Sequence, residues 1–95
     1  MLRAAIVEKS KEHREYIRAG LMGANLDIQV SEFTNEYDYL ENLNEDASSF
    51  DILILNTTIR HEGDGLKLAA GIRARNRKVM ICFITDSQRY YAEAF

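Results

Sequence analysis

Two almost unbroken apolar runs constrain the fold of this chain more than any other feature. Residues 50–55 are apolar at every position except Asp51, and the run from Val79 to Ile84 contains no charged or amide side chain. Such runs are typical of parallel strands that are buried on both faces, because strands of antiparallel sheets usually alternate apolar and polar residues. Helices are therefore expected on both sides of the sheet that contains these two strands.

The rest of the chain alternates between strand and helix patterns. Residues 2–7 form an apolar run typical of a strand, and residues 11–22 have the apolar spacing of a helix, with Ser10 as its N-cap. Residues 26–31 alternate apolar and polar side chains, which predicts an edge strand with one wet face. Three further helices are expected where apolar residues recur at helical spacing. The first contains Tyr37, Leu40 and Leu43 and follows a cap at Thr34 or Asn35, and the second contains Leu68, Ala69 and Ile72. The third covers residues 88–95 after a cap at Asp86 or Ser87.

Four alternations of strand and helix predict an α/β fold, a doubly wound parallel sheet in a single domain over residues 1–95. In such sheets the functional crevice lies at the carboxyl ends of the strands. Four residues follow strand ends and are expected on this rim, namely Glu8, Lys9, Asn56 and Thr85. They are the candidate site residues of the chain.

Composition and charge narrow the functional classes. A net charge of -3 gives no clustered positive charge for a phosphate backbone, so we expect no direct nucleic-acid binding. The single Cys82 excludes an intramolecular disulfide and is expected to be a buried thiol. The apolar residues 4–7 are too few for a signal peptide or a membrane span. The expected location is the cytoplasm, away from the membrane.

Three segments resemble response-regulator receiver domains. They read AAIVEKSKEHREYI, FDILILNTTIRHEGDGLKLAAGIR and VMICFITDSQRYYAEAF, and together they cover over half of the chain. The likeness is closest to receivers that precede LytTR-type DNA-binding domains. It implies a flavodoxin-like (CheY-like) sheet in the order 2-1-3-4, with the fifth strand and fifth helix of the family missing from this chain.

The residues of the rim depart from the receiver pattern. Receivers resembling this chain hold Mg²⁺ with two acidic residues after the first strand and with the phosphate-accepting aspartate after the third. Here these positions hold Glu8, Lys9 and Asn56, and Thr85 stands at the position of the family's switch residue. An amide is neither charged nor nucleophilic, and an ammonium group repels a divalent cation. We therefore expect a degenerate phosphoacceptor site with no bound Mg²⁺ and no enzymatic activity.

Two interpretations of Lys9 are open. Its ammonium group can take the place of the cation, pairing with Glu8 and donating to the side-chain oxygen of Asn56. Alternatively, Lys9 points into solvent, as most lysines do. A further alternative, that Asn56 was introduced in place of an aspartate in an otherwise active receiver, is disfavoured by Lys9.

Other polar clusters have simpler interpretations. His61, Glu62 and Asp64 lack the spacing of a metal motif and are expected in a solvated loop. The basic run from Arg73 to Lys78 coincides with the expected end of a helix, where cations favour the helix dipole. His13 falls on the apolar stripe of the first helix and is expected to be packed or half exposed.

The expected partners follow from the missing strand. Without a fifth strand, the run from Val79 to Ile84 becomes an apolar sheet edge, which promotes pairing with another chain. We expect a homodimer formed through this strand or through exchange of the terminal helix.

The leading functional hypothesis is a phosphorylation-independent pseudo-receiver of a transcriptional response regulator, which acts through protein contacts and a regulatory protein partner. The alternative is a stand-alone interaction or scaffold protein without an output domain.

Overall fold

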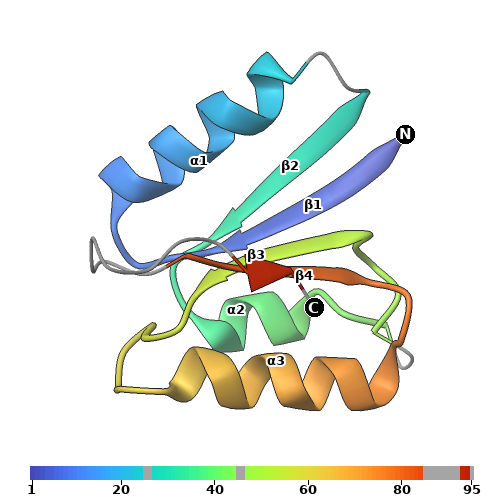
Figure 1. Ribbon diagram of the computed structural model, residues 1–95. Helices are drawn as coiled ribbons and strands as arrows, with labels where there is room; N and C mark the ends of the chain where they lie inside the picture. The colour runs from blue at the N-terminus through green and yellow to red at the C-terminus, as the bar shows by residue number, and fades with distance from the viewer. Residues whose placement is uncertain (25–26, 45–46, 85–92, 95) are drawn as a thin grey trace.

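The computed structural model describes residues 1–24, 27–44, 47–84 and 93–94. Strands and helices alternate along the chain as expected from the sequence (Figure 1). In chain order they are β1 (Leu2–Val7), α1 (Lys11–Gly23), β2 (Ile28–Phe33), α2 (Glu36–Glu41), β3 (Ile52–Asn56), α3 (Asp64–Arg75), β4 (Met80–Ile84) and β5 (Glu93–Ala94). No helix in these ranges is long and apolar enough to cross a lipid bilayer.

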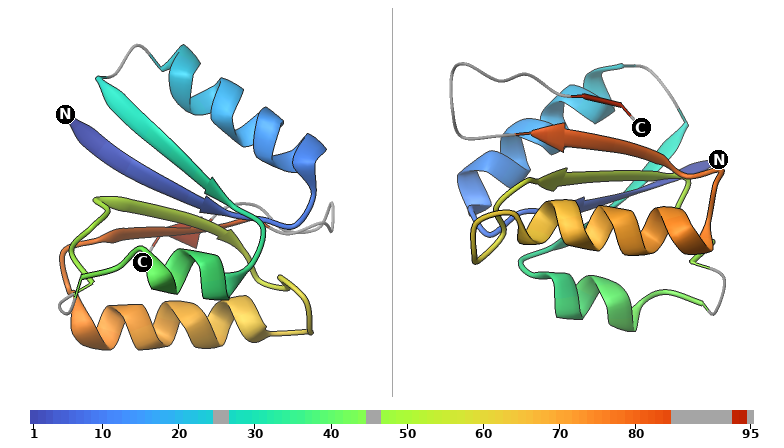
Figure 2. Two further views of the ribbon diagram at one scale, coloured as in Figure 1. Left: turned by 180° about the vertical axis from the view of Figure 1, so that it is seen from behind. Right: turned by 60° about the horizontal axis from the view of Figure 1, so that its bottom comes forward.

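The strands form one sheet in the order β2-β1-β3-β4-β5. The first four of these are parallel, so the predicted order 2-1-3-4 and the edge position of β2 are confirmed. Helices α2 and α3 cover one face of the sheet and α1 covers the other, as expected for a flavodoxin-like arrangement (Figures 1 and 2). The register places Val7 beside both Phe33 and Leu55, so the three strands end together.

The outer edge of β4 differs from the expectation. Glu93–Ala94 form a short strand that runs antiparallel to β4, with Ala94 opposite Cys82 and Glu93 opposite Phe83. The expected terminal helix is therefore wrong at these two residues, and the remainder of that helix lies outside the described residues. Unpaired amide and carbonyl groups of an apolar edge favour any strand that can reach them, and an antiparallel strand needs only a reversal of the chain.

The main core lies between the sheet and the helices α2 and α3. Alternate side chains of the central strands point toward these helices, among them Val7, Leu53 and Leu55, and the cluster extends to the fully buried Ile72 of α3. Phe33, Tyr39 and Phe50 pack at one side of it with ring centroids 5.7 to 5.9 Å apart. Such pairs add stabilisation beyond their buried area.

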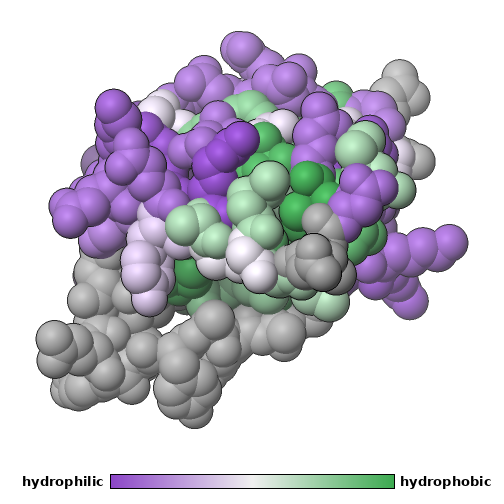
Figure 3. Space-filling model, turned by 90° about the horizontal axis from the view of Figure 1, so that it is seen from above, coloured by the Kyte–Doolittle hydropathy of each residue, from purple (hydrophilic) through white to green (hydrophobic). Residues whose placement is uncertain are grey.

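The opposite face is covered less completely. Helix α1 has no fully buried residue. Its Ile17 and Leu21 are half buried and line, with Ile54 of β3, a groove of about 450 Å³. Figure 3 views this side of the molecule and shows hydrophobic surface bordered by hydrophilic residues.

Polar contacts tie α1 to the edge strand. The carboxylate of Glu32 in β2 lies 3.4 Å from the guanidinium of Arg14 and 3.0 Å from that of Arg18. Partly exposed ion pairs of this kind each contribute at most about 1 kcal/mol. They orient the helix more than they stabilise it.

Candidate functional site

The carboxyl ends of β1 and β3 bring two of the predicted site residues together. Glu8 directly follows β1 and Asn56 ends β3, and each has an exposed fraction of only 3%. The Asn56 side-chain amide donates from Nδ2 to Oε1 of Glu8 over 2.9 Å. A buried carboxylate and a buried amide therefore satisfy one another at the rim of the sheet.

Two further donors from the start of α1 surround the Glu8 carboxylate. The backbone N–H of Ser10 donates to Oε2 over 3.0 Å, and Nδ1 of His13 lies 3.3 Å from Oε1. Burial raises the pKa of Glu8, but the hydrogen bonds from Asn56, Ser10 and His13, with the charge of His13, outweigh it. The net pKa lies below the ordinary value of a glutamate, so the group is an anion at neutral pH.

Of the two positions expected for His13, packed or half exposed, the structure has the half-exposed one. Its side chain has an exposed fraction of 52% and turns toward Glu8. The cause is local, because the hydroxyl of the N-cap Ser10 accepts the His13 backbone N–H over 3.2 Å and fixes the first turn of α1. The imidazole is thereby a polar neighbour of the site and no part of the core.

Of the two interpretations of Lys9, the pairing with Glu8 and Asn56 is not formed. Its side chain is exposed and makes no hydrogen bond or ion pair with any other residue that the structure describes. Successive side chains of an extended segment point to opposite sides, so the inward direction of Glu8 turns Lys9 outward. The solvent-facing interpretation is correct for this part of the chain, and the Asn56 amide makes the contact with Glu8 that the other interpretation gave to Lys9.

Arg14 is a site residue that the sequence did not reveal. Its guanidinium donates from Nη1 to the carbonyl oxygens of Glu8 (2.7 Å) and Lys9 (3.0 Å), and it also contacts Glu32. These bonds close the β1–α1 connection over the site. No motif marks this role, since an arginine one turn into a helix has many possible partners.

A turn after β3 fixes the orientation of the Asn56 side chain. Its Oδ1 accepts the backbone N–H of Thr58 over 2.9 Å. With Oδ1 bound to this amide and Nδ2 directed at Glu8, both ends of the side-chain amide have partners. The orientation is therefore set from both sides.

Asp64 organises the β3–α3 loop. Its carboxylate accepts the backbone N–H groups of Ile59 (2.7 Å), Arg60 (3.0 Å) and His61 (3.0 Å). Burial raises the pKa of Asp64, but these amides together with that of Gly65 lower it overall. Asp64 was expected in a solvated loop, but it is the partly exposed first residue of α3 and serves as the acceptor that the loop amides need. His61 and Glu62 are exposed, as expected.

Close packing holds the start of α3 against the site. A Cβ atom at Gly65 would lie 1.9 Å from the backbone oxygen of Asn56, so only glycine fits at this position without a shift of the backbone. The N–H of Gly65 also donates to the carbonyl of Thr57 over 3.0 Å. The loop therefore leaves β3 and returns to touch the residue at the end of that strand.

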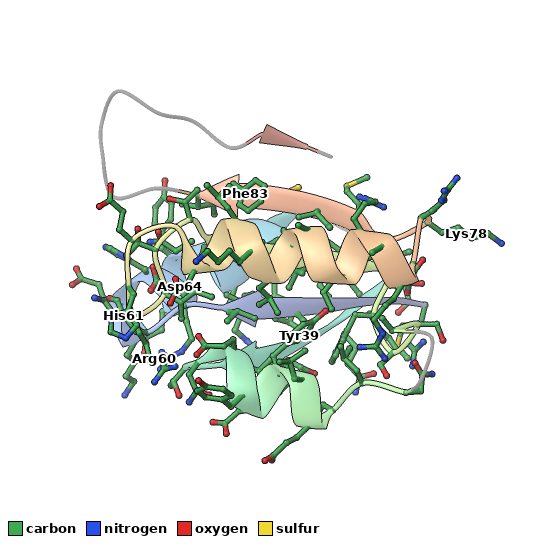
Figure 4. All side chains as sticks on the ribbon, turned by 90° about the horizontal axis from the view of Figure 1, so that it is seen from below. Tyr39, Arg60, His61, Asp64, Lys78 and Phe83 are labelled. Atoms are coloured by element: carbon green, nitrogen blue, oxygen red, sulfur yellow. The ribbon has the colours of Figure 1, made fainter. Side chains whose placement is uncertain are left out.

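The same loop is anchored to α2. The Arg60 guanidinium pairs with Glu36 at 2.5 Å and lies 4.6 Å from the ring centroid of Tyr37. Figure 4 shows Arg60, His61 and Asp64 at one end of α3, with Lys78 beyond the other end. The basic run thus lies far along the helix from the Glu8–Asn56 pair, and Thr85 lies outside the described residues.

The pocket does not fit the Mg²⁺ site implied by the receiver resemblance. Both carboxylate oxygens of Glu8 and the side-chain oxygen of Asn56 already accept hydrogen bonds. Mg²⁺ requires octahedral oxygen ligands, usually including more than one anionic group or a phosphate. Within the described ranges no group of three or more His, Cys, Asp or Glu residues could hold a metal ion. The arrangement supports hydrogen bonding and supplies no nucleophile at position 56.

No protein-family model, curated protein or solved structure matches this chain. The parallel 2-1-3-4 sheet is consistent with a flavodoxin-like fold, and the receiver resemblance remains a prediction from the sequence.

Proposed function

We propose that this chain is a phosphorylation-independent pseudo-receiver domain of a two-component-type transcriptional regulator. In this role it transmits information through contacts with other proteins. The proposal is supported most by one observation, the 2.9 Å hydrogen bond from the Asn56 amide to the buried Glu8 carboxylate. This bond occupies the place where the resemblance puts the phosphoacceptor and its acidic neighbour.

The physical argument concerns charge. An aspartate at position 56 would put a second carboxylate within hydrogen-bond distance of Glu8, and two such anions require a cation or a shared proton. An amide needs neither, because its N–H group donates to the anion directly. The pair is therefore matched to a pocket without metal, and it keeps the β1 and β3 ends together independently of any phosphodonor.

Self-association remains part of the proposal. The apolar β4 is the natural pairing strand for a second copy, but its backbone at Cys82 and Phe83 already pairs with β5. A second β4 can occupy that edge only where β5 moves aside. Light scattering at rising protein concentration measures this, and a monomer at all concentrations contradicts the homodimer.

The phosphorylation proposal is tested by incubating the protein with a small phosphodonor and Mg²⁺ and measuring its intact mass. We expect the unaltered protein and the Asn56→Asp variant to stay unmodified, the latter because it has only two of the three acidic residues with which receivers hold Mg²⁺. The double variant Lys9→Asp/Asn56→Asp restores two acidic groups and an acceptor. It is expected to gain one phosphoryl group.

The matched control is Lys9→Asp/Asn35→Asp, which makes the same charge changes but places the second aspartate at the N-cap of α2. It is expected to stay unmodified. Phosphorylation of the unaltered protein overturns the proposal. Absence of phosphorylation in the folded double variant argues that the pocket did not descend from a receiver site.

A further inference from the structure

A second surface, which does not include Glu8 or Asn56, has the features of a docking groove. It runs along α3 and the adjoining face of β4 and has a volume of about 1050 Å³. Leu66 and Met80 line it and are exposed to 49% and 51% of their surface. Phe83 lies on β4 beside α3 in Figure 4. Large apolar side chains left open in this way mark interaction sites more often than ordinary surface.

The shape of the groove fits a helix. The side of α3 that lines it extends from Leu66 to Ala74, which corresponds to about 12 Å at the rise of an α-helix, and Arg77 and Lys78 continue the lining beyond the end of the helix. Along this side the lining residues include Ala69, Ala70 and Ala74, whose small side chains let another helix approach closely. A partner helix of about three turns would fill the length of the groove.

The charge of the groove is opposite to that of the chain. Its charged lining residues are Arg73, Arg77 and Lys78, and no acidic residue that the structure describes lines it. The whole chain carries a net charge of -3. Arg77 and Lys78 are exposed and form no ion pair with another described residue, so both are available to a partner.

These charges also orient the partner. They lie at the carboxyl end of α3, so an antiparallel partner helix would place its own N-terminal turn beside them. Acidic residues in the first turn are favoured by the helix dipole as well as by the basic side chains. A helix with an acidic first turn that packs antiparallel to α3 therefore places its acidic residues both beside the basic side chains and at the positive end of its own dipole.

We propose that the α3–β4 groove binds an amphipathic helix of a partner protein, with an apolar stripe of small and aliphatic residues and an acidic N-terminal turn. The inference depends on the groove alone and goes beyond the proposed function, so it stands or fails separately from the phosphodonor experiment. A nucleic acid fits less well, because apolar side chains occupy most of the lining. A second copy fits less well, because its longer helices α1 and α3 each have a single acidic residue in the first turn, and α2, which has two, is only 6 residues long.

The test is selection from a displayed library of helical peptides of about 14 residues. The first turn varies among acidic, neutral and basic residues, and the stripe varies among Ala, Leu and Ile. We expect the enriched peptides to carry acidic first turns. Binding should weaken about tenfold for Arg77→Glu/Lys78→Glu. It should be abolished by Ala70→Trp, which fills the groove from an exposed helix position.

Matched variants separate the groove from the rest of the surface. Lys11→Glu/Lys67→Glu makes the same charge change on exposed lysines outside the groove, and Ala19→Trp adds the same bulk on the exposed side of α1. Both should bind as the unaltered protein does, and circular dichroism shows whether each variant is folded.

Several outcomes overturn the proposal. They are an absence of enriched peptides, enrichment of basic or neutral first turns, and binding that is insensitive to Ala70→Trp. Binding of a labelled single-stranded oligonucleotide that is lost in Arg77→Glu/Lys78→Glu assigns the surface to nucleic acid instead. A dimer in light scattering that Ala70→Trp dissociates assigns the groove to a second copy of the chain.

Discussion

On one face of the sheet, α2 and α3 seal Leu53 and Leu55 from water, whereas on the other face α1 buries none of its own side chains completely. The first face is held by close packing around a cluster of aliphatic and aromatic residues. The second packs through the half-buried Ile17 and Leu21 and is oriented by a helix cap and by ion pairs to Glu32. Buried apolar area dominates folding stability, so the difference predicts a stable α2–α3 layer and a more easily opened α1.

The largest expected effect compares the same substitution on the two faces. Leu53→Ala removes a fully buried side chain and leaves a cavity, so we expect a loss of about 4 kcal/mol in the free energy of unfolding. Leu21→Ala on the half-buried side of α1 should cost about 1 kcal/mol. Urea unfolding measures both. Equal losses would show that α1 is packed as firmly as α3.

Two glycines of α3 test how tightly that layer packs. Gly65→Ala puts a methyl group against the backbone oxygen of Asn56 and should cost about 2 kcal/mol. Gly71→Ala meets no atom within 4 Å and should stabilise the helix by about 0.5 kcal/mol. Thermal unfolding of the two variants gives the comparison. A neutral Gly65→Ala would mean that α3 can move away from the site at little cost.

The Glu8 carboxylate lies at the end of β1, where the two faces of the sheet meet, and makes the free energy of unfolding depend on pH. At neutral pH we expect Glu8→Gln to lower the free energy of unfolding by about 1.5 kcal/mol, because the donors around it lose their anion. The folded-state pKa of Glu8 is lowered, so its contribution is present above the pKa of a glutamate in the unfolded chain. That contribution is lost as the pH falls through the folded-state value.

Unfolding measured from neutral to acidic pH should therefore show the two proteins converging in acid. The control Glu12→Gln removes an exposed carboxylate from the first turn of α1 and should change stability by less than about 0.5 kcal/mol at any pH. Asp64, whose pKa is also lowered, contributes equally to both proteins. A constant difference between Glu8→Gln and the unaltered protein would show that the anion is not the stabilising form.

The last comparison, with an expected loss of about 1 kcal/mol, concerns the helix caps. Ser10→Ala removes the acceptor of the His13 backbone N–H and should cost about 1 kcal/mol, mostly through opening of α1. Hydrogen exchange should quicken within α1 and stay unchanged in α3. Asn35→Ala removes the corresponding cap of α2, and its cost should spread over the core because Tyr39 is buried. Faster exchange throughout the sheet in Ser10→Ala would contradict an independently opening α1.

The order of strands and helices could be predicted from the sequence because the patterns that mark them are local. The apolar runs at residues 50–55 and 79–84 and the alternating run at 26–31 carry their periodicity within a few residues, so the central and edge strands could be placed. The convergence of Glu8 and Asn56 followed from the same strands, since parallel strands end on one rim. The cap at Ser10 was likewise visible.

The errors concern contacts whose partners are distant in the sequence or depend on side-chain direction. Asn56 bonds Glu8 where Lys9 was an alternative, and the choice depends on which side of the strand end each residue faces. Asp64 accepts loop amides that become neighbours only when the loop folds back. The antiparallel β5 could not be anticipated, because the apolar spacing of residues 88–95 predicts a helix and a strand of two residues is too short to show a periodicity of its own.

The contact between Gly65 and the oxygen of Asn56 also gives a way to find relatives of this domain. The contact involves the backbone oxygen of Asn56 and none of its side-chain atoms, whereas any side chain at position 65 collides with that oxygen. A homologue that keeps this turn should therefore still carry the glycine, whichever residue stands at position 56. A search template built on that glycine and the preceding Asp64, with position 56 left open, should gather such homologues.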